Sequence, residues 1–262
     1  MSEALLVSGD ARGITTLTLN RPAALNALNP ELGEALERAV GVLAGDRALR
    51  AVVLTGAGEA FCAGGDVKSM RAAVEGDRQA RISRSRSFAG LLAALRALPV
   101  PVLARVNGPA YGGGAGLVSV ADIAIAADTA RFGFTEPRIG IAPATISPYV
   151  LERIGAAAAR RLFLTARRFD AAEGLRLGLY HRVVARGALD AALEEEIEAI
   201  LKCSPSALAA CKRLIADVPA MDRAQAIAHT AEVLADLWES DDAREGIASF
   251  AEKRAPRWTR GL

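Results

Sequence analysis

Phe61-Cys62-Ala63-Gly64-Gly65-Asp66 and Val106-Asn107-Gly108-Pro109-Ala110-Tyr111-Gly112-Gly113-Gly114 are two glycine loops, each placed after a β-like apolar run and before a helix-like run. Glycine allows the backbone to approach a ligand closely because no Cβ stands in the way. A helix N-terminus leaves its first N–H groups unpaired and carries a partial positive charge. Two such loops facing each other would direct two N–H donors at one oxygen, which is the geometry of an oxyanion hole.

The first half of the chain alternates strand-like and helix-like segments around these loops. Asn29 and Pro30 predict the N-cap and first residue of a helix. A second helix is predicted to start near Val67. A third covers Phe88 to Leu98 and is ended by Pro99 and Pro101, and a fourth covers residues 113–120. The predicted strands cover residues 4–7, 14–19, 51–55, 102–106 and 123–126. This alternation indicates an α/β core.

The second half is predominantly helical. Helices are predicted to start at Ser147 and Asp170, and further helices to cover residues 188–202, 204–216, 222–239 and 241–253. They are short and amphipathic with little local core, so they are expected to pack on the α/β body or on another subunit.

Composition limits the possible functions. The 262 residues are 52% hydrophobic, enough for one sizeable core, and the net charge of +2 gives no strong field toward nucleic acid or membranes. Three cysteines at no metal-like spacing indicate reduced thiols. No basic, apolar leader and no run of about 18 apolar residues is found. These features predict a soluble, cytoplasmic protein without a bound metal.

Three stretches together carry a family resemblance. They are the run from Leu19 through Asn20-Arg21-Pro22 to Leu28, the loop at 60–66, and the loop at 107–114. In this order and spacing, with Glu136 after Phe132-Gly133, they resemble the crotonase (enoyl-CoA hydratase/isomerase) superfamily. The stretch 141–150 resembles the methylglutaconyl-CoA hydratase-like branch of it.

The resemblance implies a fold and an assembly. The expected fold is a crotonase-like spiral of β-β-α repeats over residues 1–195, which bind and process an acyl-CoA. Residues 196–262 would form a C-terminal helical region for oligomerisation into a homotrimer or hexamer. Coenzyme A would be carried as part of the substrate, with no separate cofactor.

The resemblance also implies site residues. The backbone N–H groups of Ala63 and Gly113 would hold the thioester carbonyl and the enolate that forms from it. The further residues expected to line the substrate site are Ala24, Gly64, Gly65, Asp66, Val67, Tyr111 and Gly116. The residues expected to contact the CoA part are Arg21, Lys68, Phe250 and Lys253, of which the last two would reach a neighbouring subunit's CoA.

One position departs from the family's pattern. The two-glutamate hydratases carry one glutamate where Gly116 stands here and the other where Glu136 stands. Glu136 alone would then polarise the water and return its proton to the α-carbon. The alternative for Glu136 is a surface carboxylate paired with Arg138 or Arg131. The missing side chain at Gly116 predicts room for a branched or acid-bearing acyl group, whose acid end would meet Arg138.

The sequence leaves several functions open. Hydration of a 2-enoyl-CoA is favoured, and a double-bond isomerase or a thioester hydrolase of the same fold are the alternatives. A non-catalytic CoA or RNA binder is the alternative from another class, based on arginines at Arg81, Arg84 and Arg86, and at 160–161 and 167–168. These lack interleaved aromatic residues, so solvated helix faces are the expected role and nucleic-acid binding is not.

Overall fold

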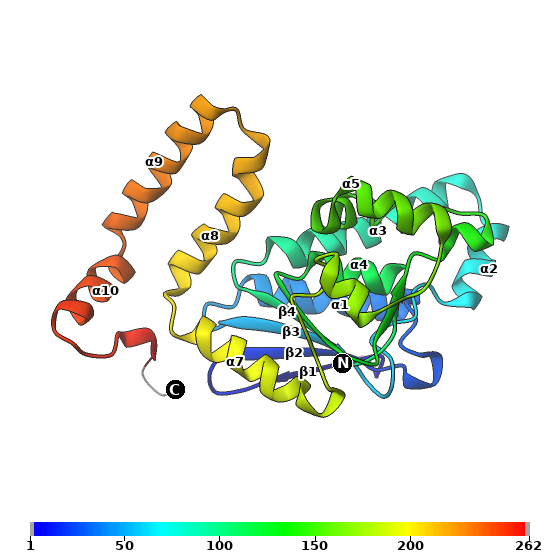
Figure 1. Ribbon diagram of the computed structural model, residues 1–262, viewed down its shortest axis with the longest axis horizontal. Helices are drawn as coiled ribbons and strands as arrows, with labels where there is room; N and C mark the ends of the chain where they lie inside the picture. Colours follow the sequence, from blue (N-terminus) through cyan, green and yellow to red (C-terminus); the bar gives the residue numbers. More distant parts are fainter. Residues whose placement is uncertain (1–2, 260–262) are drawn as a thin grey trace.

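The computed structural model describes residues 3–259, and within that range the strands form two sheets (Figure 1). The larger has six strands in the order β1 (Leu5–Gly9), β2 (Ile14–Leu19), β3 (Ala51–Gly56), β4 (Val102–Val106), β6 (Ile123–Ala127) and β9 (Arg182–Val184). β1 is antiparallel to β2, and each later neighbour is parallel. The smaller has three strands: β5 (Ala110–Tyr111), β7 (Arg131–Gly133) and β8 (Phe169–Asp170).

The chain repeats one path between these sheets. A strand of the large sheet is followed by a short extended segment beside the small sheet, and then by a helix. β4 leads to β5 and α4 (Gly113–Val120), and β6 leads to β7 and α5 (Ser147–Thr165). β3 leads to Cys62, which bridges Ala110 of β5, and then to α2 (Val67–Glu75) and α3 (Arg78–Ala97). The predicted spiral of β-β-α repeats is confirmed.

Local signals fix the helix ends as predicted. α1 (Pro30–Ala44) has proline in its first position, and the side chain of Asn29 accepts a hydrogen bond from the Leu32 N–H at 2.9 Å. Asp66 caps α2 in the same way, accepting from the Ser69 N–H at 3.1 Å. α3 ends at Ala97, shortly before Pro99.

The two faces of the large sheet carry different helices. Val52 and Leu54 of β3 point to the main core, which α1, α3, α4 and α5 cover. Val53 and its neighbours on adjacent strands point to the other face, which α7 (Leu189–Leu201) covers (Figure 1). The domain boundary predicted after residue 195 therefore lies inside α7, which packs on the sheet along its length, and the projecting helices begin after it.

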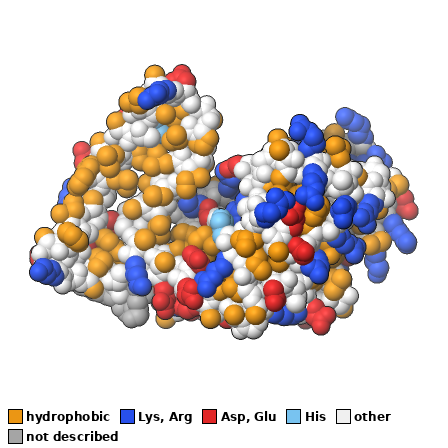
Figure 2. Space-filling view, in the orientation of Figure 1, with side chains coloured by type: hydrophobic (Ala, Val, Ile, Leu, Met, Phe, Trp, Pro, Cys, Tyr) orange, Lys and Arg blue, Asp and Glu red, His pale blue; other side chains and the backbone are white. Residues whose placement is uncertain are grey.

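The short helix α6 (Ala171–Arg176) follows β8. The last three α-helices form an arm, defined here as α8 (Pro205–Asp217), α9 (Arg223–Glu239) and α10 (Asp241–Ala251), which extends away from the core (Figure 1). Lys212 of α8 ties it to the core: its Nζ lies 2.6 Å from Asp122 Oδ2 and donates to the Val100 carbonyl at 2.9 Å. Hydrophobic side chains lie open along the arm (Figure 2), among them Ile227 at 63% and Trp238 at 61% exposed. No helix within residues 3–259 is long and apolar enough to cross a membrane.

Candidate active site

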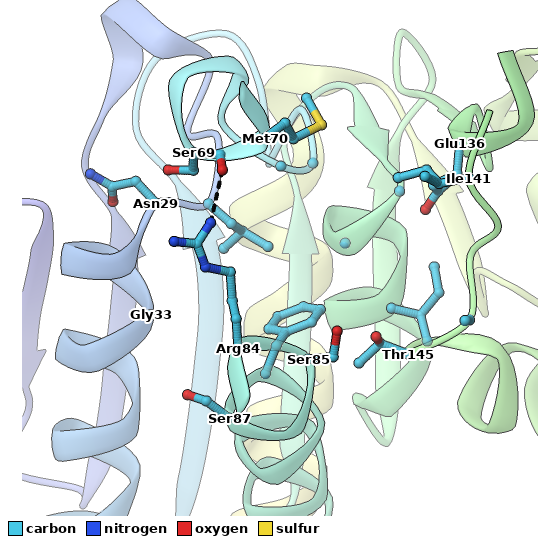
Figure 3. Close-up of a pocket in the computed structure, with 18 of the residues that line it drawn as sticks. Asn29, Gly33, Ser69, Met70, Arg84, Ser85, Ser87, Glu136, Ile141 and Thr145 are labelled. Atoms are coloured by element: carbon cyan, nitrogen blue, oxygen red, sulfur yellow. Dashed lines mark hydrogen bonds between the residues drawn. The ribbon is translucent and has the colours of Figure 1, made fainter. Parts of the chain in front are cut away.

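A cavity of about 670 Å³ joins both glycine loops to Glu136. Its walls come from α1, the start of α2, the first half of α3, and the loop between Ile139 and Ile146 (Figure 3). Among the predicted site residues, those that line it are Ala63, Gly64, Gly65, Gly113 and Glu136.

The second loop delivers a free N–H to this cavity. Gly112 has φ +49°, which favours glycine, and its own N–H donates to the Gly133 carbonyl at 3.0 Å. α4 begins at the next residue, Gly113, so the Gly113 N–H has no intrahelical acceptor. The Phe88 ring lies beside Gly113: a Cβ there would be 3.4 Å from Phe88 Cζ and 2.8 Å from Leu28 Cδ1.

The first loop delivers its free N–H from a different residue than predicted. The prediction that Ala63 is a donor is wrong, because the Ala63 N–H already donates to the Leu25 carbonyl at 2.9 Å. Leu28 pairs with the next residues: its N–H donates to Gly64 O at 2.7 Å, and its carbonyl accepts from the Asp66 N–H at 2.9 Å. The N–H of Gly65, between them, has no acceptor within residues 3–259. Gly65 and Gly113, one from each glycine loop, therefore line the cavity with N–H groups that have no acceptor within residues 3–259.

Glu136 supplies the carboxylate. It starts the short helix η2 (Glu136–Ile139), is half-buried, and lines the cavity. Its Oε2 has no hydrogen-bond partner within residues 3–259, and burial raises the pKa of Glu136 above its ordinary value. The alternative of an ion pair with Arg138 or Arg131 is wrong, since neither pairs with Glu136 in that range. A Cβ at Gly112 would lie 3.0 Å from Glu136 Oε1, a second reason for glycine there.

The expected space at Gly116 does not exist. A Cβ at this position would lie 2.3 Å from Cγ2 of Ile146, which is 2% exposed. Ile146 lines the cavity and Gly116 does not. The prediction that the missing side chain leaves room for a larger acyl group is therefore wrong, because an isoleucine thirty residues later in the chain fills the space. Arg138, the predicted partner for an acid end, is exposed and does not line the cavity.

Arg21 and Asp66 are engaged with each other. Arg21 Nη2 lies 3.0 Å from Asp66 Oδ2, and both side chains are largely buried at 22% and 13% exposed. Arg21 also donates to the Ala27 carbonyl. The hydrogen bond from the Ser69 N–H and the one from Arg21 lower the pKa of Asp66. This pair fixes the entrance of α2 to the loop before α1, so it holds the first glycine loop in place.

The other predicted contact residues lie outside the cavity wall, and they are Ala24, Val67, Lys68, Tyr111, Phe250 and Lys253. The guanidinium carbon of Arg168 lies over the Tyr111 ring, 4.8 Å from the ring centre. Phe250, at 88% exposed, and Lys253 lie at the α10 end of the arm, far from α2 (Figure 1). Their contact with a neighbouring subunit's CoA stays a prediction.

Two other side chains with reactive groups, Cys62 and His181, have structural roles. Cys62 is buried, and burial raises the pKa of its thiol to about 12, as expected of an inert thiol. His181 Nδ1 accepts from the Ala124 N–H at 3.0 Å, so it supports the sheet. Within residues 3–259 no group of three or more His, Cys, Asp or Glu side chains could hold a metal ion.

Several cavity residues were not predicted, among them Met70, Arg84, Ile141 and Ile146. A signal for one wall was present: Arg84, Phe88 and Leu91 recur at helical spacing and share one face of α3. The loop residues carried no such periodicity. They reach the cavity through the path of the chain between β7 and α5.

Comparison with known proteins identifies the family of this chain. The sequence model of the family described as Enoyl-CoA hydratase/isomerase matches residues 9–261. The chain belongs to the enoyl-CoA hydratase/isomerase family. It is 37% identical to Enoyl-CoA hydratase EchA19 of Mycobacterium tuberculosis, over 95% of this chain and 94% of that one. It is 35% identical to the Short-chain-enoyl-CoA hydratase of Clostridium acetobutylicum, over 92% of each.

Solved structures of the family match the fold as well. The structure of Pseudomonas aeruginosa AtuE superposes with a TM-score of 0.95 at 40% identity, over 98% of this chain and 100% of that one. The predicted membership of the crotonase superfamily and the prediction of an enoyl-CoA hydratase-like enzyme are confirmed. The methylglutaconyl-CoA branch stays a prediction.

Proposed function

We propose that the protein adds water across the double bond of a 2-enoyl-CoA thioester. The observation that carries this proposal is that one cavity holds the free N–H groups of Gly65 and Gly113 together with the half-buried carboxylate of Glu136, whose Oε2 has no hydrogen-bond partner within residues 3–259. Two backbone donors suit an oxygen that gains negative charge, and a carboxylate oxygen without a partner suits proton transfer.

The proposed steps balance with one carboxylate. Glu136 accepts a proton from water while the water oxygen bonds to the β-carbon of the substrate. The electron pair of the double bond moves toward the thioester oxygen, where the Gly65 and Gly113 N–H groups stabilise the enolate. The protonated Glu136 then gives its proton to the α-carbon, and the carbonyl re-forms. The raised pKa of Glu136 favours the first step, because a carboxylate with a higher pKa is a stronger base toward the proton of water.

The same proposal covers partners and cofactors. Hydration needs no oxidant or reductant, and the groups that polarise the thioester and the water are backbone N–H groups and a carboxylate. We therefore propose that no separate cofactor takes part and that coenzyme A enters only as part of the substrate. We further propose a cytoplasmic homotrimer or hexamer that buries the apolar side chains along the arm, such as Ile227 and Trp238.

The test is the loss of enoyl thioester absorbance over a panel of short, branched and acid-bearing 2-enoyl-CoA esters, with Glu136→Gln as the matched variant. Hydration by the wild type, with loss in the variant and unchanged ester binding, supports the proposal. Double-bond migration without hydration would instead indicate an isomerase, and release of free CoA a hydrolase. Salt-dependent RNA retention without turnover of any ester would favour a binding protein.

A further inference from the structure

One cation lines the catalytic cavity, and nothing in the hydration mechanism uses it. Arg84 lies on α3, on the same face as Phe88 and Leu91. Among the cavity-lining residues within the described range, it is the one lysine or arginine. Its neighbours on α3 behave differently: Arg81 donates to the carbonyls of Ala73 and Val74 at the end of α2, and Arg86 does not line the cavity.

The guanidinium of Arg84 is held but not neutralised. Its Nη1 donates to the Ser69 carbonyl at 2.8 Å, the dashed line in Figure 3, and no carboxylate within residues 3–259 forms an ion pair with it. In the figure it lies across the cavity from Glu136 and Ile141. The backbone bond fixes the position of the group, and the other N–H donors of its planar fork stay free for a ligand.

Two carboxylates of α1 also line the cavity, and each has a partner. Glu37 accepts a hydrogen bond from the Ser87 hydroxyl, and Glu34 lies 3.7 Å from Arg38 on its own helix. They therefore leave Arg84 unpaired. A free guanidinium facing a substrate cavity is suited to bind a carboxylate through two charge-assisted hydrogen bonds.

Helix geometry sets the length of the matching ligand. Phe88 contacts the position of Gly113, where the thioester oxygen would bind, and Arg84 lies one turn earlier on α3. One helical turn is about 5.4 Å. A five-carbon diacyl chain spans about 5 Å from its first to its last carbon, given bonds of about 1.5 Å at tetrahedral angles. A short diacyl group would thus place its far carboxylate near Arg84 while its middle carbons contact Phe88.

We propose that Arg84 is a specificity-determining residue, which selects 2-enoyl-CoA esters whose short acyl chain ends in a second carboxylate. The inference rests on the proposed hydratase function and narrows its substrate class. It replaces Arg138 as the partner of the acid end, because Arg84 lines the cavity and Arg138 does not.

The test compares glutaconyl-CoA with crotonyl-CoA as substrates of the wild type, of Arg84→Gln and of Arg84→Lys, with Arg86→Gln as the matched control on the same helix. The wild type should have the higher kcat/KM for glutaconyl-CoA. In Arg84→Gln the ratio of the two kcat/KM values should fall about 10-fold or more, the scale of losing a hydrogen bond to a charged group. Arg84→Lys should recover part of the ratio, and Arg86→Gln should not change it.

A binding measurement makes the result independent of turnover. The saturated analogues glutaryl-CoA and butyryl-CoA cannot be hydrated, and the wild type should bind glutaryl-CoA more tightly by calorimetry, a preference that Arg84→Gln should lose. Equal weakening of both analogues in Arg84→Gln would overturn the inference, because Arg84 would then contact the common CoA part or only support Ser69. A wild type that hydrates crotonyl-CoA but binds butyryl-CoA at least as tightly would also overturn it and leave the hydratase proposal intact. Failure of the hydratase proposal is recognised separately, since no ester would then be hydrated whatever the binding preference.

Discussion

Proline at position 113 tests the oxyanion hole directly. It removes the one backbone N–H that α4 offers to the cavity, and proline is well tolerated in the first position of a helix, where no intrahelical hydrogen bond is lost. We therefore expect Gly113→Pro to fold and to lose turnover. The matched control is Gly113→Ala, which keeps the N–H and adds a comparable Cβ.

The expected loss in kcat follows from separating the two effects of Gly113→Pro, which are the added Cβ and the lost N–H donor. Any Cβ at 113 meets Leu28 Cδ1 at 2.8 Å and Phe88 Cζ at 3.4 Å, so both variants share this crowding at the tips of movable side chains. Only proline lacks the donor. Loss of one oxyanion donor costs about 2.7–4 kcal/mol of transition-state stabilisation, which lowers kcat by about 10²- to 10³-fold. We expect this factor between the alanine and proline variants.

The assay is the initial rate of 2-enoyl-CoA hydration, with folding checked by circular dichroism and thermal unfolding. A folded Gly113→Pro enzyme with the kcat of Gly113→Ala would refute the assignment of this N–H. If the proline variant does not fold, Gly113 can be replaced by the corresponding hydroxy acid. The peptide bond between residues 112 and 113 then becomes an ester, which removes the same N–H donor without adding a ring.

Three further outcomes follow from the same structure. Glu136→Gln should lower kcat at least about 100-fold. Because burial raises the pKa of Glu136, its charged form destabilises the folded state at pH 7, so the variant should unfold at a higher urea concentration there. This gain in stability should vanish below pH 4.5, the ordinary pKa of the group. Gly116→Ala should lower the free energy of unfolding by about 1–3 kcal/mol through overpacking, partly offset by about 1 kcal/mol of helix propensity. In double-mutant cycles measured by denaturant titration, Ile146→Ala should reduce this loss because it removes Cγ2, whereas Ile146→Val keeps Cγ2 and should not. The arm should assemble at least three chains, and a monomeric mass by light scattering at micromolar concentration would contradict this.

Much of the fold was predictable because its signals are local. Asn29 with Pro30, and Asp66 before Val67, specify helix starts through bonds within three residues, and the structure has both. The alternation of apolar runs and glycine loops predicted the α/β core, and the family resemblance implied its arrangement as a spiral. Glu136 was also found from the sequence, since its place after Phe132-Gly133 marks it within the family.

The sequence by itself therefore determined most of the helices and long strands, the family, the two loops and the candidate carboxylate of Glu136. Only the tertiary structure decided which groups of those loops are free. Ala63 and Gly65 are equivalent candidates along the chain, but the Leu25 carbonyl takes the N–H of one and leaves the other. Ile146 likewise closes the space at Gly116, and α3 turns Arg84, but not Arg86, toward the cavity. Each outcome depends on contacts through space between segments far apart in sequence, and no local pattern of hydrophobicity or helix capping encodes them.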